Sequence, residues 1–103
     1  LEATGLEPAI MVDCSHANSE KDYHNQPKVC ASLCQQIAGG DSSIRATMIE
    51  SHLKEGAQKL NPDRTQLEYG VSVTDSCVGW ETTVEMVQDL ARAVRKRRAT
   101  FLA

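Results

Sequence analysis

The chain has 103 residues and a formal net charge of −3, so it forms one small domain at most. Hydrophobic residues make up 41% of it, yet it has only one Trp, two Tyr and one Phe, so small aliphatic side chains must build the core. That composition favours parallel strands covered by helices. The acidic balance argues against a nucleic-acid partner, and no apolar run is long enough to span a membrane.

The beginning of the sequence predicts that the chain is part of a longer polypeptide. It has no initiator methionine, and residues 1–4 followed by Gly5 are typical of the end of a helix. We therefore expect further sequence upstream in the complete protein.

Three short apolar runs each end beside a residue that can bind a metal. The runs are Ile10–Asp13, Ile44–Glu50 and Val71–Thr74. They predict strands, and the tips of parallel strands share one face of an α/β sheet, where such folds place their chemistry. The residues at these tips, His16, Glu50 and Asp75, are therefore candidate ligands for Mn²⁺, Fe²⁺, Co²⁺ or Zn²⁺. On spacing alone, the alternative that His16 is simply a hydrogen-bonded residue at a strand end stays open.

A helix is predicted between the first two runs. Asn25 is placed to cap it, Pro27 suits its first turn, and Gly39-Gly40 ends it. Its apolar stripe consists of Val29, Cys30, Leu33, Cys34 and Ile37. Strand, helix and strand together predict a βαβ unit with a right-handed crossover.

The polar stretch 51–70 has no sustained helical stripe and carries Gly56, Pro62 and Gly70. Long connections of this kind are usually functional or disordered. Because the stretch follows Glu50, we expect it to form a wall or lid of the site, with a plain surface excursion as the alternative.

A second helix is predicted after the third run, beginning at a capping box formed by Thr82 and Glu85. Its apolar face consists of Val84, Val87, Leu90, Ala91 and Val94. The basic residues 95–98 are expected in its last turn, where cations are stabilised by the helix dipole. This charged run is interpreted as a solvated helix end, with phosphate or partner binding as the alternative.

The four cysteines are too sparse and irregular for a disulfide scaffold. We expect reduced, buried thiols that act as small hydrophobic side chains. A zinc site formed by Cys14, His16, Cys30 and Cys34 is the alternative, although the spacing lacks the usual knuckle.

Four motifs resemble one known family closely, in the same order and with nearly the same spacing. They are Val12-Asp13-Cys14-Ser15-His16-Ala17-Asn18-Ser19, Gln35-Gln36-Ile37-Ala38-Gly39-Gly40, Met48-Ile49-Glu50-Ser51-His52-Leu53 with Glu55-Gly56, and Thr74-Asp75-Ser76-Cys77-Val78-Gly79-Trp80-Glu81. Together they resemble the C-terminal third of class I 3-deoxy-D-arabino-heptulosonate-7-phosphate (DAHP) synthase. The family fold is a (β/α)8 TIM barrel, of which residues 1–103 would supply about three β/α units.

The resemblance implies a cytoplasmic, metal-dependent transferase at the first step of aromatic amino acid biosynthesis, condensing phosphoenolpyruvate with erythrose 4-phosphate. It implies that His16, Glu50 and Asp75 are metal-binding and catalytic residues, beside a family Cys ligand that lies upstream. The phosphoenolpyruvate-binding Lys and Arg residues also lie upstream, so this chain alone is expected to be inactive. The implied partners are the N-terminal part of the same barrel and further copies of the enzyme. A non-catalytic half-barrel that serves as an assembly module is the alternative.

Overall fold

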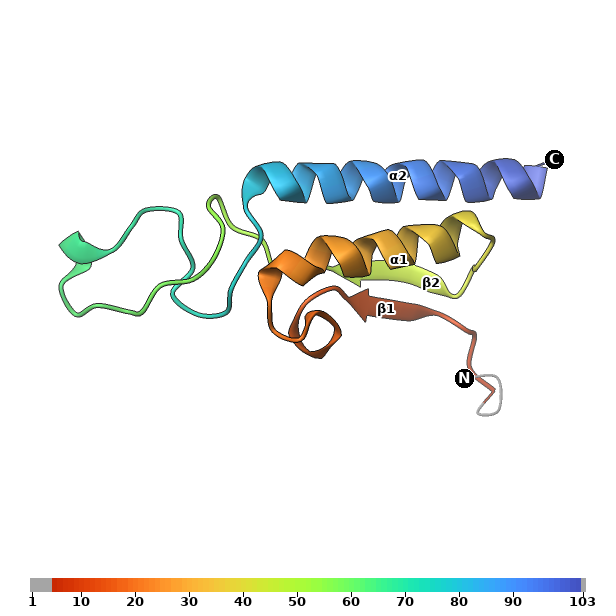
Figure 1. Ribbon diagram of the computed structural model, residues 1–103. Coiled ribbons are helices and arrows are strands. Elements are labelled where there is room, and N and C mark those ends of the chain that lie inside the picture. Colours follow the sequence, from red (N-terminus) through yellow and green to blue (C-terminus); the bar gives the residue numbers. More distant parts are fainter. Residues whose placement is uncertain (1–4, 103) are drawn as a thin grey trace.

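The computed structural model describes residues 5–102, which form a mixed α/β unit and a long irregular excursion (Figure 1). The regular elements are the strands β1 (Ile10–Asp13) and β2 (Ile44–Met48) and the helices α1 (Gln26–Ala38) and α2 (Trp80–Leu102). The prediction about a helix end before Gly5 concerns residues 1–4, which lie outside the described residues.

The predicted βαβ unit is confirmed. β1 and β2 pair in parallel, with Met11 opposite Ala46 and Asp13 opposite Met48, and α1 connects them. β2 ends at Met48, two residues earlier than the apolar run predicts. The strand tips at Asp13 and Met48 therefore lie side by side, and the polar residues that follow each strand leave the sheet at the same edge.

α1 forms where the sequence predicts it, because its apolar positions recur at helical spacing. Cys30, Leu33 and Ile37 are buried along one face, and Pro27 lies in the first turn, where its missing N–H has no helical partner. The predicted cap is wrong: the Asn25 side chain makes no capping bond and instead donates to the Ser19 carbonyl oxygen at 3.0 Å.

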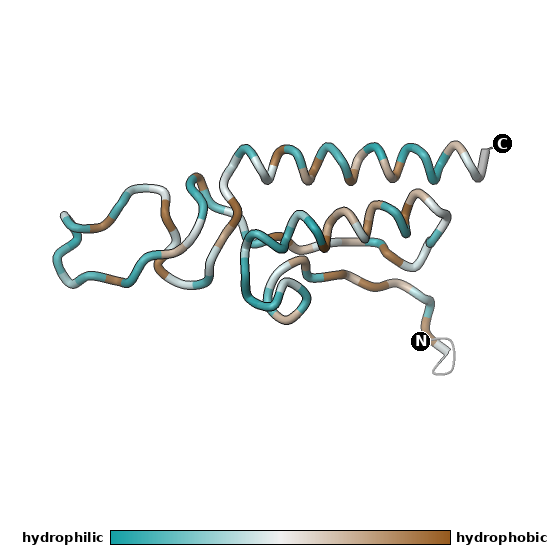
Figure 2. Tube along the Cα trace, viewed as in Figure 1, coloured by the Kyte–Doolittle hydropathy of each residue, from teal (hydrophilic) through white to brown (hydrophobic). Residues whose placement is uncertain are grey.

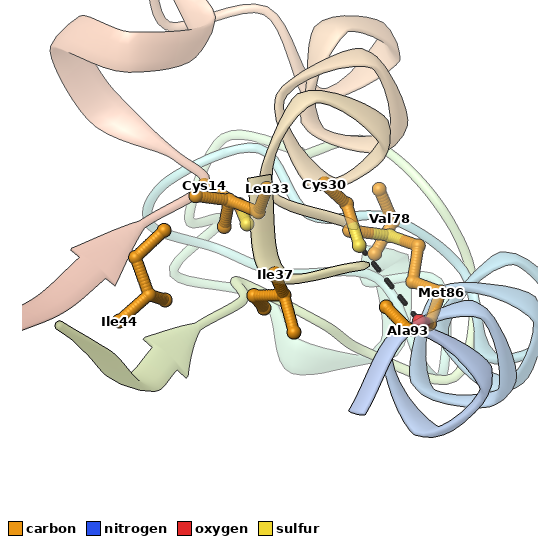
Figure 3. Close-up of a cluster of buried hydrophobic side chains, with 8 residues drawn as sticks. All are labelled: Cys14, Cys30, Leu33, Ile37, Ile44, Val78, Met86 and Ala93. Atoms are coloured by element: carbon orange, nitrogen blue, oxygen red, sulfur yellow. Dashed lines mark hydrogen bonds between the residues drawn. The ribbon is translucent and has the colours of Figure 1, made fainter. Parts of the chain in front are cut away.

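The core lies between the sheet and the two helices (Figure 3). Its buried members come from the residue after β1, from α1, from β2, from the first two-thirds of α2 and from the turn before α2: Cys14, Cys30, Leu33, Ile37, Ile44, Val78, Met86 and Ala93. The Cys30 thiol donates a weak bond to the Met86 carbonyl oxygen at 3.7 Å, which joins α1 to α2. This core is small and aliphatic, as the composition predicts.

The predicted third strand at Val71–Thr74 is wrong. Within that segment, Ser72 forms a single isolated parallel bridge with Ala57, and the other isolated bridges, Gly56 with Cys77 and Ser51 with Val78, lie after it. A strand persists only when a neighbour satisfies its backbone groups, and β2 has already ended before it reaches this segment.

Residues 51–76 form an excursion that extends away from the helices and strands (Figure 1). The Gln58 side chain links the outgoing and returning parts of the excursion. It donates to the carbonyl oxygens of Glu68 and Val71 and accepts from the Glu68 amide at 2.9 Å. Hydrogen bonds, rather than a buried core, therefore hold most of this segment in shape.

α2 begins at Trp80, so the predicted capping box is wrong. Thr82 lies inside the first turn, and the neighbouring Thr83 hydroxyl donates to the Gly79 carbonyl oxygen at 2.8 Å. The predicted stripe is confirmed in part, because Leu90 and Val94 pack against the core. Val84 and Val87 are exposed, and Met86 and Ala93 are buried in their place. The helix continues to Leu102, so residues 95–98 precede its last turn.

The first half of β1 is exposed in this chain. Ile10 and Met11 of β1 are 42% and 65% exposed, although the sequence predicts a buried strand. The same apolar stretch stands out along the trace in Figure 2. Among the described residues, no helix is long and apolar enough to cross a membrane.

Candidate metal centre

His16, Glu50 and Asp75 converge in space although they are far apart in the sequence. His16 Nε2 lies 3.2 Å from Glu50 Oε1 and 3.2 Å from Asp75 Oδ2. One ligand atom of each residue lies within 4.8 Å of the others. The structure thus brings together the three residues that the strand tips predict, including Asp75, whose own segment is not a strand.

Asp13 fixes the orientation of the His16 ring. Its Oδ2 lies 2.7 Å from His16 Nδ1, which leaves Nε2 facing the other two carboxylates. Asp13 is itself held by the Ser15 amide at 2.7 Å and by the Ser15 hydroxyl. A carboxylate behind an imidazole is the arrangement that usually orients a metal-binding histidine.

The electrostatics of the cluster favour a positive charge at His16 Nε2. The hydrogen bond to Asp13, followed by that to Asp75, raises the pKa of His16 above its usual value. Burial raises the pKa of Asp13, but bonds from Ser15 and His16 outweigh it and hold this pKa below its usual value. One imidazole nitrogen facing two carboxylates suits a divalent cation equally well, so the donor set fits a metal.

Glu50 is positioned by a buried glutamine rather than by the sheet. Gln26 is 1% exposed, and its side chain accepts from the Glu50 amide at 3.0 Å and donates to the Glu50 carbonyl oxygen at 3.1 Å. The Val78 amide donates to the same carbonyl oxygen at 3.0 Å. Glu50 therefore lies where α1, the end of β2 and the return of the excursion meet.

The three residues open into a cavity of about 210 Å³. Its walls come from the turn after β1 and from the two acidic segments: Ser15, His16, Ser19, Lys21, Tyr23, Glu50, Asp75 and Ser76. Residues 51–70 contribute nothing to this lining, so the expectation that they form a wall or lid is not met, and the surface excursion describes them better.

The turn after β1 has an unusual backbone. His16, Glu20 and Lys21 have φ angles of 50°, 55° and 62°, the left-handed region that non-glycine residues rarely adopt. The Lys21 amide donates to the His16 carbonyl oxygen at 2.8 Å, and the Ser19 hydroxyl donates to the same oxygen at 3.1 Å. These bonds tie the cavity-lining turn to the candidate ligand, and such strain is common at functional sites.

The cysteines are reduced, as the sequence predicts, although Cys34 is only half-buried. All four are free thiols, and Cys14, Cys30 and Cys77 are buried. Burial raises the pKa of Cys34 and of Cys77, which makes both thiols less reactive. Among residues 5–102, the three-residue metal cluster that forms is His16 with Glu50 and Asp75, so the alternative zinc site with Cys14, Cys30 and Cys34 is not assembled.

The chain is similar in sequence to proteins of one known family. The chain matches the sequence profile of the DAHP synthetase I family over residues 1–88. The chain belongs to the DAHP synthetase I family. It is 55% identical over 101 residues to the tyrosine-inhibited phospho-2-dehydro-3-deoxyheptonate aldolase of Schizosaccharomyces pombe, an alignment covering 95% of this chain and 27% of that protein.

Other members of the DAHP synthetase I family are similar to the chain over the same short share of their length. The Phe-sensitive phospho-2-dehydro-3-deoxyheptonate aldolase of Escherichia coli K12 is 50% identical over 98 residues, which cover 95% of this chain and 28% of that enzyme. The solved structure of the Francisella tularensis SCHU S4 aldolase superposes with a TM-score of 0.79 at 46% identity, covering 86% of this chain and 25% of that one. The chain therefore spans about a quarter of the length of these relatives.

Sequence reasoning missed several residues around the three candidate ligands of this family member. It did not identify Asp13 as the partner of His16, although a carboxylate three residues before a histidine at a strand end is a usable signal. It also missed Gln26, because a buried glutamine at the start of a helix has no distinctive pattern. Lys21 and Tyr23 were missed because the turn that places them is strained and irregular.

Proposed function

We propose that this chain forms the C-terminal part of a 3-deoxy-D-arabino-heptulosonate-7-phosphate (DAHP) synthase that condenses phosphoenolpyruvate with erythrose 4-phosphate. The observation that carries the proposal is the convergence of His16, Glu50 and Asp75 at one end of the unit. Membership of the DAHP synthetase I family supports the same reaction. Water is consumed and the phosphate of phosphoenolpyruvate is released, so the products are inorganic phosphate and DAHP, the first intermediate of aromatic amino acid biosynthesis.

His16, Glu50 and Asp75 are proposed to hold a divalent cation, Mn²⁺, Fe²⁺, Co²⁺ or Zn²⁺. When bound, such an ion supplies Lewis-acid polarisation of the aldehyde carbonyl of erythrose 4-phosphate. The protein's own task is to present the donor atoms: Asp13 holds the His16 ring, and Gln26 holds the backbone of Glu50. When the ion is bound, the two carboxylates would lower the net charge of the centre.

The rest of the active site is proposed to come from the N-terminal part of the same polypeptide. The exposed side chains Ile10 and Met11 of β1 supply an apolar surface against which that part could pack, as expected for part of a TIM barrel. The upstream part would contribute the family's Cys ligand and its phosphate-binding Lys and Arg residues. A cytoplasmic homo-oligomer is the form we propose for the complete enzyme.

The test is an assay of the complete protein with both substrates. Condensation should require the divalent ion, be lost after chelation and return when the ion is restored. Turnover that persists in protein shown by elemental analysis to be free of metal would contradict the proposed site. Absence of condensation in metal-loaded complete protein would contradict the proposed reaction and favour a non-catalytic assembly module.

A further inference from the structure

We propose that Lys21 is an anion-binding residue of the cavity, contacting a phosphate or carboxylate group of a substrate held beside His16, Glu50 and Asp75. The proposal rests on the proposed function for the identity of the substrates. It adds a basic residue from this chain to a site whose other basic residues are expected upstream.

The cavity lining contains one lysine beside the candidate metal ligands. Glu50 and Asp75 carry the negative charges of the lining, and Lys21 is its one lysine. Within this chain's part of the lining, a divalent ion held by Glu50 and Asp75 would balance their two charges, and Lys21 would add one positive charge. That charge would attract the anionic groups that both proposed substrates carry.

Lys21 is free to make that contact. In the part of the chain that the structure describes, its ammonium group forms no ion pair, whereas Lys54 is paired with Glu68 at 3.3 Å. The hydroxyls of Tyr23 and Ser76, which also line the cavity, make no hydrogen bond with described residues. Three donors are therefore available to an anion, while the hydroxyls of Ser15 and Ser19 are already engaged.

Lys21 reaches the cavity from a turn whose backbone conformation is unfavourable for residues other than glycine. Both Glu20 and Lys21 adopt positive φ, and the Lys21 amide is anchored to the His16 carbonyl oxygen. A glycine would relieve the strain at Lys21. The lysine occupies this strained position beside the candidate ligand, which points to a role for its side chain.

The experiment measures ligand binding by calorimetry in the complete, Mn²⁺-loaded protein, with phosphoenolpyruvate, erythrose 4-phosphate and inorganic phosphate as separate probes. Lys21→Gln removes the charge at similar length, Lys21→Arg keeps it, and Lys21→Gly removes it while favouring the positive φ. Lys28→Gln, a lysine on α1 outside the cavity, is the matched control. Metal content is measured in every variant.

We expect Lys21→Gln and Lys21→Gly to weaken at least one probe by about 10-fold or more, and Lys21→Arg by less than about 3-fold. Metal content should not change, and Lys28→Gln should bind like the wild type. The probe that loses affinity identifies the anion: loss confined to phosphoenolpyruvate assigns Lys21 to that substrate, and loss confined to erythrose 4-phosphate to the other.

Unchanged binding of all three probes in Lys21→Gln would overturn the proposal. So would a loss in Lys21→Arg as large as that in Lys21→Gln, or full binding by Lys21→Gly, because either result would separate the effect from the charge. These binding data do not depend on turnover. A wild-type protein with Lys21-dependent phosphate binding but no condensation would refute the proposed function and leave this inference standing.

Discussion

Residues 10–48 and residues 51–76 lie on either side of the Glu50 junction and hold their shape in different ways. The first region has paired strands, a covering helix and buried side chains such as Leu33 and Ile37. The second region has isolated bridges and a glutamine clamp at Gln58, and it leaves Leu60 and Tyr69 exposed. One region is fixed by apolar burial and the other mainly by hydrogen bonds, which contribute less net stability.

The candidate site draws on both regions. His16 comes from the packed region, Asp75 from the end of the hydrogen-bonded one, and Glu50 from the junction. The position of the Asp75 carboxylate therefore depends on how firmly residues 51–76 are held in place. Substitutions that destabilise either region should therefore impair the site, and variants in each region separate the two contributions.

The largest effect is expected when the 103-residue chain is tested alone. We predict no measurable condensation of phosphoenolpyruvate with erythrose 4-phosphate, because the proposed upstream ligand and phosphate-binding residues are missing and the excursion lacks its support. Adding the separately produced N-terminal part should restore activity, measured by the disappearance of phosphoenolpyruvate. Robust turnover by the chain alone would show that residues 1–103 already contain the whole site.

Removal of a ligand in the complete enzyme should be almost as damaging. His16→Ala, Glu50→Ala or Asp75→Ala should each abolish most activity and lower metal affinity by about 10-fold or more. His24→Ala is the matched control, because His24 Nδ1 also bonds a carboxylate, Asp22 at 2.9 Å, but lies outside the cavity. Full activity with unchanged metal content in any of the first three variants would remove that residue from the site.

A pair of leucine variants compares the stability of the two regions directly. Leu33→Ala should destabilise the complete protein by about 2–5 kcal/mol in denaturant unfolding, because Leu33 is 4% exposed and leaves a cavity in the core. Leu60→Ala removes the same atoms from a side chain that is 70% exposed and should cost less than about 0.5 kcal/mol. A larger cost at Leu60 would show that another part of the complete protein covers the excursion.

The same contrast explains which elements and site residues could be predicted from the sequence. β1, α1 and β2 were predictable because their apolar positions repeat at strand or helix spacing and bury against one another. Val71–Thr74 has the composition of a strand but fails to form one, since pairing depends on a neighbour that composition does not reveal. The three candidate ligands were found because they follow apolar runs. Gln26 was not found, because it holds Glu50 through a contact between residues 24 positions apart, and Asp13 was overlooked although it lies only three residues before His16.

The start of α2 also shows how a local motif misled the prediction. Thr82 and Glu85 match a capping box, but the helix begins two residues earlier, at Trp80. The Ser51–Thr83 and Thr83–Gly79 bonds found instead join residues separated by up to 32 positions. A pattern confined to four residues does not register such a long-range alternative.

The smallest effect concerns the bond that joins the excursion to α2. Thr83 donates to the Gly79 carbonyl oxygen at 2.8 Å, so its hydroxyl accepts from Ser51, the first residue of the excursion. Thr83→Val keeps the shape and removes both bonds, and should lower the free energy of unfolding by about 1 kcal/mol. Thr82→Val is the matched control and should change it by less than about 0.5 kcal/mol, because no described residue bonds its hydroxyl. A cost of about 1 kcal/mol or more at Thr82 would favour the capping box, and a cost below about 0.5 kcal/mol at Thr83 would contradict the role of its two bonds.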